Sequence, residues 1–185
     1  MKFLLYHSRS KTDDGKYLSN FAKMEKEVYI EIDEEKYKRD VLKEKKFKSI
    51  EQAFQGYKLA ISGCSESVID DLINTEDGKE VKKKGGKGFF KKLKLELDIS
   101  NWSRESDDFM RYLVRKRLMV DERYKEIIGE AINNGVKLYH FDRSGGKSKH
   151  GGFFEKTTGK WVGGNMLSKF MEEEYVKLYG KSDLM

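Results

Sequence analysis

Helical patterns dominate this sequence and restrict the folds that it can adopt. In four stretches, the spacing of apolar residues and the flanking capping residues favour a helix. We expect helices over residues 50–61, 65–74, 106–133 and 165–179, the third of them broken near Val120 and Asp121. Strand patterns are fewer and do not alternate regularly with the helices. The sequence therefore predicts an α+β fold that is mainly helical with a small sheet.

Short segments supply the expected strands, which are residues 1–6, 27–32 and 136–141. The second and third alternate apolar and polar residues with a period of two, as a half-buried strand does. We expect a loop over 15–21. The basic stretch 79–94 is expected to be a loop followed by a short strand or helix, and the Gly- and Lys-rich stretch 144–164 is expected to be a loop.

Length and composition favour one folded domain over residues 1–185, because the chain has no internal repeat and no long Gly/Ser linker. Aromatic residues make up 12% of the chain, and this argues against disorder because each buries a large apolar area. No apolar run approaches the roughly 20 residues of a membrane span. The lone Cys64 cannot form an internal disulfide, so we expect a small buried residue in a cytoplasmic protein.

Lysine carries most of the positive charge. The chain has 38 Lys and Arg against 32 Asp and Glu, a formal net charge of +6. Lysine favours diffuse attraction to phosphates over bidentate reading of bases. The Lys-rich run 82–88 lacks the order of a Walker loop, and it is interpreted either as a solvated loop or as a surface that attracts nucleic acid or a substrate phosphate.

The three histidines, His7, His140 and His150, show no metal-ligand spacing. We therefore expect neither a metal ion nor another cofactor.

One expected helix carries a row of three functional groups. Ser49, followed three residues later by Gln52, is a capping-box pattern that predicts where this helix begins. Glu51, Gln55 and Lys58 then stand at i, i+4 and i+7 and share one face. A carboxylate, an amide and an ammonium group in one row can bind a sugar hydroxyl or a phosphate. The alternative is an ordinary surface row, with the carboxylate favoured by the helix dipole.

Four segments of the chain resemble motifs of the NADAR family, and they occur in the family's order. The family's helix motif, E-H-x-x-Q-A-x-K, is similar to Glu51-Gln52-Ala53-Phe54-Gln55-Gly56-Tyr57-Lys58. Its F-L-S-N-F loop is similar to Tyr17-Leu18-Ser19-Asn20-Phe21. Its W-x(7)-M motif is matched by Trp102 and Met110, and its G-x-N-x-L-G motif by Gly163-Gly164-Asn165-Met166-Leu167-Ser168. The ordered set is more specific than any one of its motifs.

This resemblance implies an activity as well as a fold. NADAR proteins are N-glycosidases that act on ribose-linked amines, including riboflavin biosynthesis intermediates and ADP-ribosylated guanine. The resemblance thus implies a compact NADAR-like domain that hydrolyses the N-glycosidic bond of a ribosyl-amine substrate. The alternative is a catalytically impaired relative that binds ADP-ribose, a nucleotide or nucleic acid.

The resemblance also assigns roles to residues. Glu51 would be the catalytic carboxylate, which stabilises positive charge on the sugar as the C–N bond breaks. Trp102 would stack on the leaving base, although it could instead be a core residue that packs against Met110. The substrate-binding set would be Asn20, Phe21, Gln55, Lys58, Trp102 and Asn165.

Two departures from the family pattern bear on the mechanism. Gln52 stands where the family has His, and Ser168 replaces the last Gly. The family's D-x-x-W-G pattern, which would supply a second acidic group, is not clearly present. We expect Asp142 to supply the second catalytic carboxylate, with Glu155 or His140 as alternatives.

Overall fold

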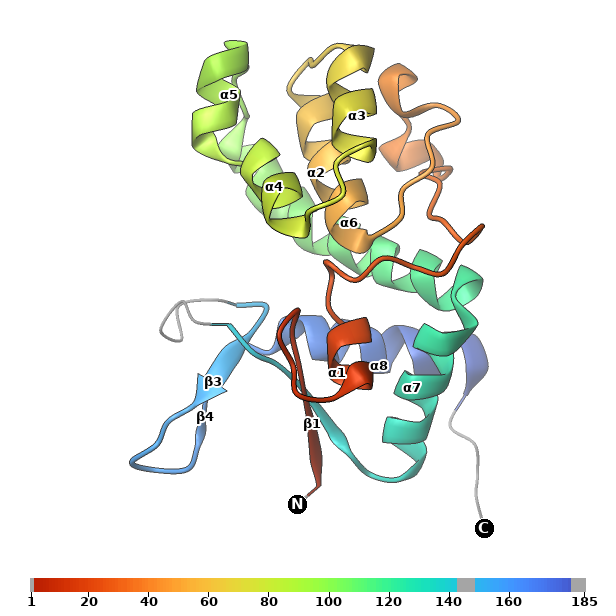
Figure 1. Cartoon of the computed structure of the whole chain (residues 1–185), viewed down its shortest axis with the longest axis vertical. Coiled ribbons are helices and arrows are strands. Elements are labelled where there is room, and N and C mark those ends of the chain that lie inside the picture. Colours follow the sequence, from red (N-terminus) through yellow and green to blue (C-terminus); the bar gives the residue numbers. More distant parts are fainter. Residues whose placement is uncertain (1, 143–148, 181–185) are drawn as a thin grey trace. The chain divides into compact units, whose positions relative to one another are not determined.

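The computed structural model describes residues 2–142 and 149–180, and it is mainly helical with two small two-stranded sheets (Figure 1). The α+β class is thereby confirmed. The chain divides into two compact units, one formed by Met1–Ala22 with Asp121–Met185 and the other by Lys23–Val120. The expectation of a single domain stays a prediction. None of the described helices combines the length and the apolar character that crossing a membrane requires.

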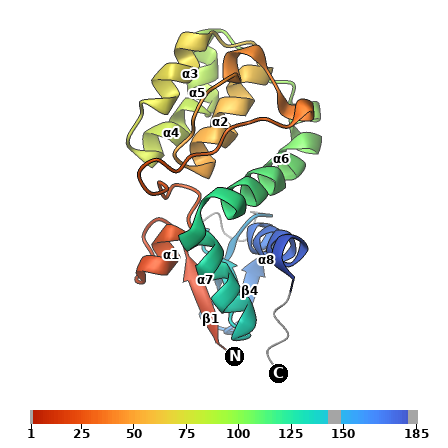
Figure 2. The ribbon, with the colours of Figure 1, turned by 90° about the vertical axis from the view of Figure 1, so that its right-hand side faces the viewer.

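The unit Lys23–Val120 is built around one central helix, α2 (Ile50–Ile61), which packs against α3, α4 and α6 (Figure 2). The surrounding helices are α3 (Glu66–Ile73), α4 (Gly78–Lys84), α5 (Lys87–Leu93) and α6 (Ile99–Val120). The α2 helix begins and ends at the predicted residues, and α3 matches its prediction to within one residue at each end. Fully buried apolar side chains form the core of this unit, among them Ile50, Ala53, Tyr57, Leu59, Leu72, Phe109 and Leu113.

The first turn of α2 is fixed by side-chain hydrogen bonds. Ser49 Oγ accepts from the backbone N–H of Gln52 at 3.2 Å, as the capping pattern predicts. The amide of Gln52 reaches past the cap: its Oε1 accepts from Lys48 N at 2.9 Å. Its Nε2 donates to the carbonyls of Ile73 and Thr75, both at 3.1 Å. At the position where the NADAR motif has His, this chain therefore has a structural bridge between α2 and the end of α3.

The loop expected in the first part of residues 79–94 is wrong, because helix α4 occupies it, whereas α5 agrees with the short helix that was one of the two alternatives for the second part. The α4 helix is capped by Asp77, whose carboxylate accepts from Lys79 N at 2.7 Å and from Glu80 N at 3.3 Å. Val81 on α4 and Phe90 on α5 are buried. Capping and burial of one apolar residue per helix outweigh the repulsion between the lysines.

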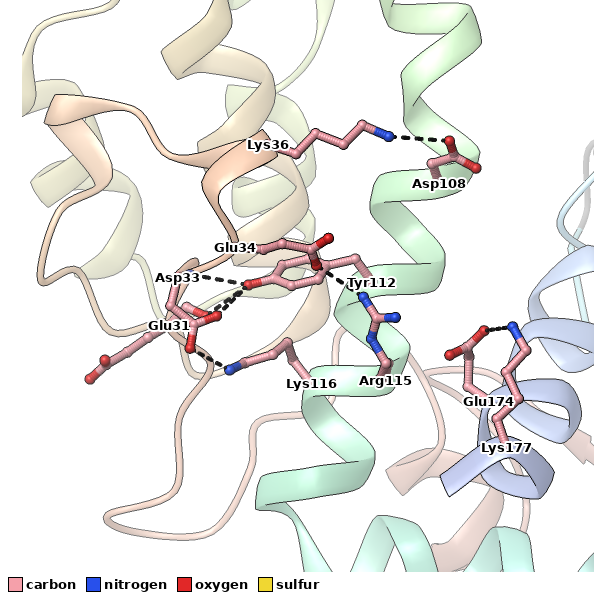
Figure 3. A network of polar contacts seen from close by, with 10 residues as sticks. All are labelled: Glu31, Asp33, Glu34, Lys36, Asp108, Tyr112, Arg115, Lys116, Glu174 and Lys177. Carbon is pink, nitrogen blue, oxygen red and sulfur yellow. Dashed lines mark hydrogen bonds and ion pairs between the residues drawn. The ribbon is translucent and has the colours of Figure 1, made fainter. Parts of the chain in front are cut away.

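The strand expected over 27–32 is also wrong, since its only pairing among the described residues is an antiparallel bridge between Ile30 and Phe47. No neighbouring strand extends the pairing. The segment that follows is instead fastened to α6 by side chains (Figure 3). The Tyr112 hydroxyl donates to Asp33 Oδ1 at 3.0 Å, and Lys116 Nζ lies 2.7 Å from Asp33 Oδ2. The 3-10 turns Glu35–Tyr37 and Asp40–Leu42 complete this connection.

The other unit holds the strands. The strands β1 (Phe3–Tyr6) and β2 (Lys137–His140) pair in parallel, with Phe3 opposite Lys137, and fall within two of the predicted segments. The helices of this unit are α1 (Asp13–Tyr17), α7 (Glu122–Asn133) and α8 (Met166–Tyr179), the last of which agrees with its prediction.

Two loop predictions in this unit are corrected. Part of the expected loop at 15–21 is helix α1, capped by Thr12 Oγ1, which accepts from Gly15 N. Within the expected loop at 144–164, β3 (Gly152–Phe154) and β4 (Trp161–Gly163) form an antiparallel hairpin. Residues 144–148 of that predicted loop lie outside the described residues.

The predicted break in the long helical region lies at Asp121, between α6 and α7, although α6 begins at Ile99 rather than near residue 106. Asp121 is only 3% exposed. Its Oδ1 accepts from Tyr124 N at 3.1 Å and thus caps α7. The Tyr17 hydroxyl lies 3.0 Å from Oδ1 and 3.1 Å from Oδ2. One buried carboxylate therefore both starts α7 and holds the end of α1.

We expect Asp121→Ala to lower the free energy of unfolding by about 2 kcal/mol or more, because it removes the cap and leaves the Tyr17 hydroxyl without this acceptor. Asp121→Asn keeps one acceptor oxygen and should lose less. Urea unfolding of the two variants measures the difference. An equal loss of unfolding free energy in the two variants would show that the acceptor oxygens of Asp121 do not stabilise the ends of α1 and α7.

Candidate active site

Glu51 lies in the first turn of α2 with its side chain nearly enclosed, at 7% exposed. Gln55 Nε2 donates to its Oε1 at 2.9 Å. Burial raises the pKa of the Glu51 carboxyl, while the bond from Gln55 and the charges of Lys82 and Lys58 oppose the shift. Such a carboxyl retains its proton to a higher pH than an exposed one, which suits a group that takes up and releases protons.

Lys58 lies two turns further along the same face. Its Nζ donates to the backbone carbonyl of Gly85 at 2.6 Å. It also lies 5.3 Å from the ring centroid of Phe90 and 5.9 Å from that of Trp102. Burial lowers the pKa of Lys58, and the charge of Glu51 opposes this. A partly desolvated ammonium group interacts with an anion more strongly than a fully hydrated one does.

Gln55 and Gly85 meet where the α4–α5 turn approaches α2. A Cβ at Gly85 would overlap the Oε1 and Cδ atoms of Gln55, so this amide would have to move before any other residue could occupy position 85. The Gln55 side chain is buried, and its Oε1 has no hydrogen-bond donor among the described residues. A buried acceptor without a donor costs about 1–3 kcal/mol. The Gln55 Oε1 atom is thus a buried acceptor that no donor of the described residues satisfies.

Trp102, on α6, closes one side of this row. Its ring centroid lies 4.9 Å from that of Phe54 and 6.4 Å from that of Tyr57, both on α2. The side chain is half-buried. It therefore packs against α2 and also keeps part of its surface accessible, so its role in stacking on a base stays a prediction.

The structure brings together four of the predicted site residues in the unit Lys23–Val120, namely Glu51, Gln55, Lys58 and Trp102. The other four belong to the second unit. Asn20 is buried in the turn after α1, and Phe21 beside it is half-buried. Asp142 is half-buried just after β2, where its N–H donates to the carbonyl of Gly152 at 2.7 Å.

Asn165, the fourth of these, binds backbone within its own unit. Its Nδ2 donates to the Leu138 carbonyl at 2.9 Å, and its Oδ1 accepts from His140 N at 3.0 Å and from Ser168 Oγ at 2.8 Å. It also has a left-handed backbone, with φ at 51°. The amide thus joins strand β2 to the start of α8, a structural role that the resemblance did not indicate. Its assignment to substrate binding stays a prediction.

The candidates for the second acid differ in their surroundings. Burial lowers the pKa of His140 to about 4, so it is neutral near pH 7 and can be a hydrogen-bond partner but not a cationic acid. Glu155 Oε2 accepts from Thr158 Oγ1 at 2.6 Å within the β3–β4 hairpin. The choice of Asp142 remains a prediction.

Two further observations concern metal and thiol chemistry. Among residues 2–142 and 149–180, no three His, Cys, Asp or Glu side chains form a group that could hold a metal ion. Cys64 is buried, as predicted, and burial raises the pKa of its thiol to about 11. A thiol with so high a pKa is a poor nucleophile at neutral pH.

Gly85 provides a test of this geometry. We expect Gly85→Ala to lower the free energy of unfolding by about 1–3 kcal/mol, because the new methyl group displaces the buried Gln55 amide. Its φ of −91° is ordinary for alanine, so backbone strain does not contribute. Gly88→Ala is the matched control: nothing lies within 4 Å of a Cβ there, and the change should stabilise α5 by up to about 1 kcal/mol. In a Gln55→Ala background, Gly85→Ala should lose most of its effect; an unchanged loss would contradict the contact.

The raised pKa of Glu51 predicts a pH-dependent stability. Because the folded chain holds this proton above the ordinary value of 4.5, the Glu51 contribution to stability falls as the pH rises from about 4.5 through the folded pKa. Glu51→Gln removes the buried charge and keeps an acceptor for Gln55. We expect it to be more stable than the parent at pH 7, with a gain that disappears towards pH 4.5. Urea unfolding at both values measures this, and a destabilised variant at pH 7 would contradict the assignment.

Comparison with known proteins supports the fold alone. No family model matches the chain, and no curated protein matches it in sequence. The NMR structure of the E. coli protein YbiA is similar, with a TM-score of 0.62 and 16% sequence identity over 96% of this chain and 84% of YbiA. YbiA is a NADAR family member. The chain therefore has a YbiA-like fold, in agreement with the fold that its four sequence motifs imply.

Proposed function

We propose that this protein is an N-glycosidase that hydrolyses the bond between ribose and an amine nitrogen. The observation that carries the proposal is the buried Glu51 carboxyl, paired with Gln55 and in one row with Lys58. These residues match the NADAR helix motif, and the chain has the fold of YbiA. A surface row would leave Glu51 solvated, which it is not.

The chemistry follows from the charge that develops on the sugar. As the C–N bond breaks, its electron pair leaves with the nitrogen and positive charge builds on the anomeric carbon. The ionised Glu51 carboxylate stabilises this charge and accepts a proton from the attacking water. Its raised pKa suits the second task, because a more basic carboxylate takes the proton more readily. The hydroxide part of the water bonds to the anomeric carbon, and the proton that Glu51 took from the water passes to the departing amine, so that ribose keeps a new hydroxyl group.

The neighbouring groups suit a ribosyl phosphate. The unpaired Oε1 of Gln55 can accept from a ribose hydroxyl, which would satisfy it. A phosphate oxygen can replace the Gly85 carbonyl as the acceptor for Lys58 Nζ. The half-exposed ring of Trp102 offers a face on which the leaving base can stack.

Four residues of the other unit complete the proposal: three lie in the matched motifs, and Asp142 follows the strand β2 where the family's acidic pattern is not clearly present. Asn20, Phe21 and Asn165 would contact the substrate, and Asp142 would supply the second carboxylate, with His140 as a neutral hydrogen-bond partner. Two acidic groups around a cationic transition state stabilise it more than one does. The substrate would be a riboflavin biosynthesis intermediate or ADP-ribosylated guanine, and a cytoplasmic location would agree with the lone thiol of Cys64.

The test is a panel assay that covers a riboflavin intermediate and ADP-ribosyl-guanine DNA, with released ribose 5-phosphate or ADP-ribose measured by mass spectrometry. We expect Glu51→Gln to reduce turnover by on the order of 10²-fold or more. Glu96→Gln, which neutralises an exposed carboxylate of the same unit, should leave turnover unchanged.

Near-normal turnover by a folded Glu51→Gln protein would remove Glu51 from the mechanism. Tight binding of ADP-ribose or a nucleotide without turnover of any substrate in the panel would instead support the alternative of a catalytically impaired binding protein.

A further inference from the structure

Positive charge is concentrated on one part of the surface. Residues 78–95, which include α4 and α5, contain eight lysines and one acidic residue, Glu80, for a formal charge of +7. The whole chain has a formal charge of +6, so the rest of it is close to neutral. The net charge of this protein is thus a property of one helical pair rather than of its surface as a whole.

Two lysines of this helical pair form ion pairs, Lys83 with Glu80 and Lys84 with Asp71. In the described part of the chain, five exposed lysines of α4, α5 and its C-cap form no ion pair: Lys79, Lys87, Lys91, Lys92 and Lys94. Their charges are available to an external anion.

Helix stability accounts for only some of these lysines: Lys91 and Lys92 lie in the last turn of α5, where the helix dipole favours positive charge. The N-cap of α5, Gly86, provides no side-chain hydrogen bond. Lys87 places a positive charge at the first residue of the helix, where the dipole disfavours it. Lys87 and Lys91 are like charges at i and i+4, which destabilise a helix. The position of Lys87 therefore costs local stability, and such departures are expected at functional surfaces.

The chemistry of this surface identifies its partner. Phe90 is buried, Phe89 and Leu93 are half-buried, and none of the exposed large apolar side chains of the described residues lies on α5, which does not suit insertion into a membrane. The segment contains lysine and no arginine, which suits point-charge contact with phosphates rather than bidentate reading of bases. We propose that the exposed lysines of α4 and α5 bind the phosphate backbone of nucleic acid without sequence preference. This binding does not depend on the proposed hydrolysis.

The test is fluorescence anisotropy with a short labelled DNA duplex of mixed sequence, at salt concentrations from about 50 to about 200 mM. If the five lysines contact phosphates, the logarithm of the association constant should fall against the logarithm of the salt concentration with a slope of about −4.5. The double variant Lys87→Glu/Lys91→Glu should bind about tenfold or more weakly and reduce the slope by about 2. Lys87→Arg/Lys91→Arg should bind as the parent does.

The control is Lys26→Glu/Lys169→Glu, which changes the net charge equally at exposed lysines elsewhere. It should bind nearly as the parent does, and equal losses in both double variants would overturn the proposal by showing that net charge alone matters. Binding to anionic phosphatidylserine vesicles without binding to the duplex would also overturn it, in favour of a membrane surface.

A Tm of the Lys87→Glu/Lys91→Glu variant at or above that of the parent would show that weak binding does not arise from unfolding. Glu51→Gln should bind the duplex normally, so this result and the hydrolysis assay can fail separately.

Discussion

Gly85 has no side chain, and this allows the turn between α4 and α5 to approach α2 closely. The Gln55 amide fills the space that a Cβ would need, and the Gly85 carbonyl accepts from Lys58. Gln55 in turn donates to Glu51. The close approach of the Gly85 backbone to α2 therefore positions the side chains of Glu51, Gln55 and Lys58. Their common burial shifts the pKa values of the Glu51 and Lys58 side chains.

Buried polar groups in this protein are of two kinds. Asp121, Asn165 and Gln52 use their oxygens and amides to cap helices or to join elements through the backbone. Gln55 Oε1 and Trp161 Nε1 are buried without a hydrogen-bond partner among the described residues. The first kind stabilises the fold, whereas the second costs stability. Gln55 is the residue of the α2 row that belongs to the second kind.

Lys87 and its neighbour Lys91 show a similar cost in stability at the surface. Lysines at i and i+4 and at the first residue of α5 weaken the helix, yet Phe90 anchors it by burial. The turn between these two helices also carries Gly85. The part of the fold that positions the candidate site is thus the part that carries the unpaired positive charge, which would favour any phosphate-bearing ligand near it.

The sequence by itself determined the features that neighbouring residues encode. The bounds of α2 follow from helical spacing and the Ser49 cap, the α6–α7 break follows from Asp121, and the common face of Glu51, Gln55 and Lys58 follows from helix geometry. Tertiary structure decided the other features, because they depend on contacts with residues that are distant in the chain. The alternation at 27–32 became a single bridge for lack of a neighbouring strand, and α4 and the β3–β4 hairpin formed where loops were expected. Likewise, no local pattern could show that Gly85 lies against Gln55 or that Glu51 is enclosed, since burial arises only when separate helices pack together.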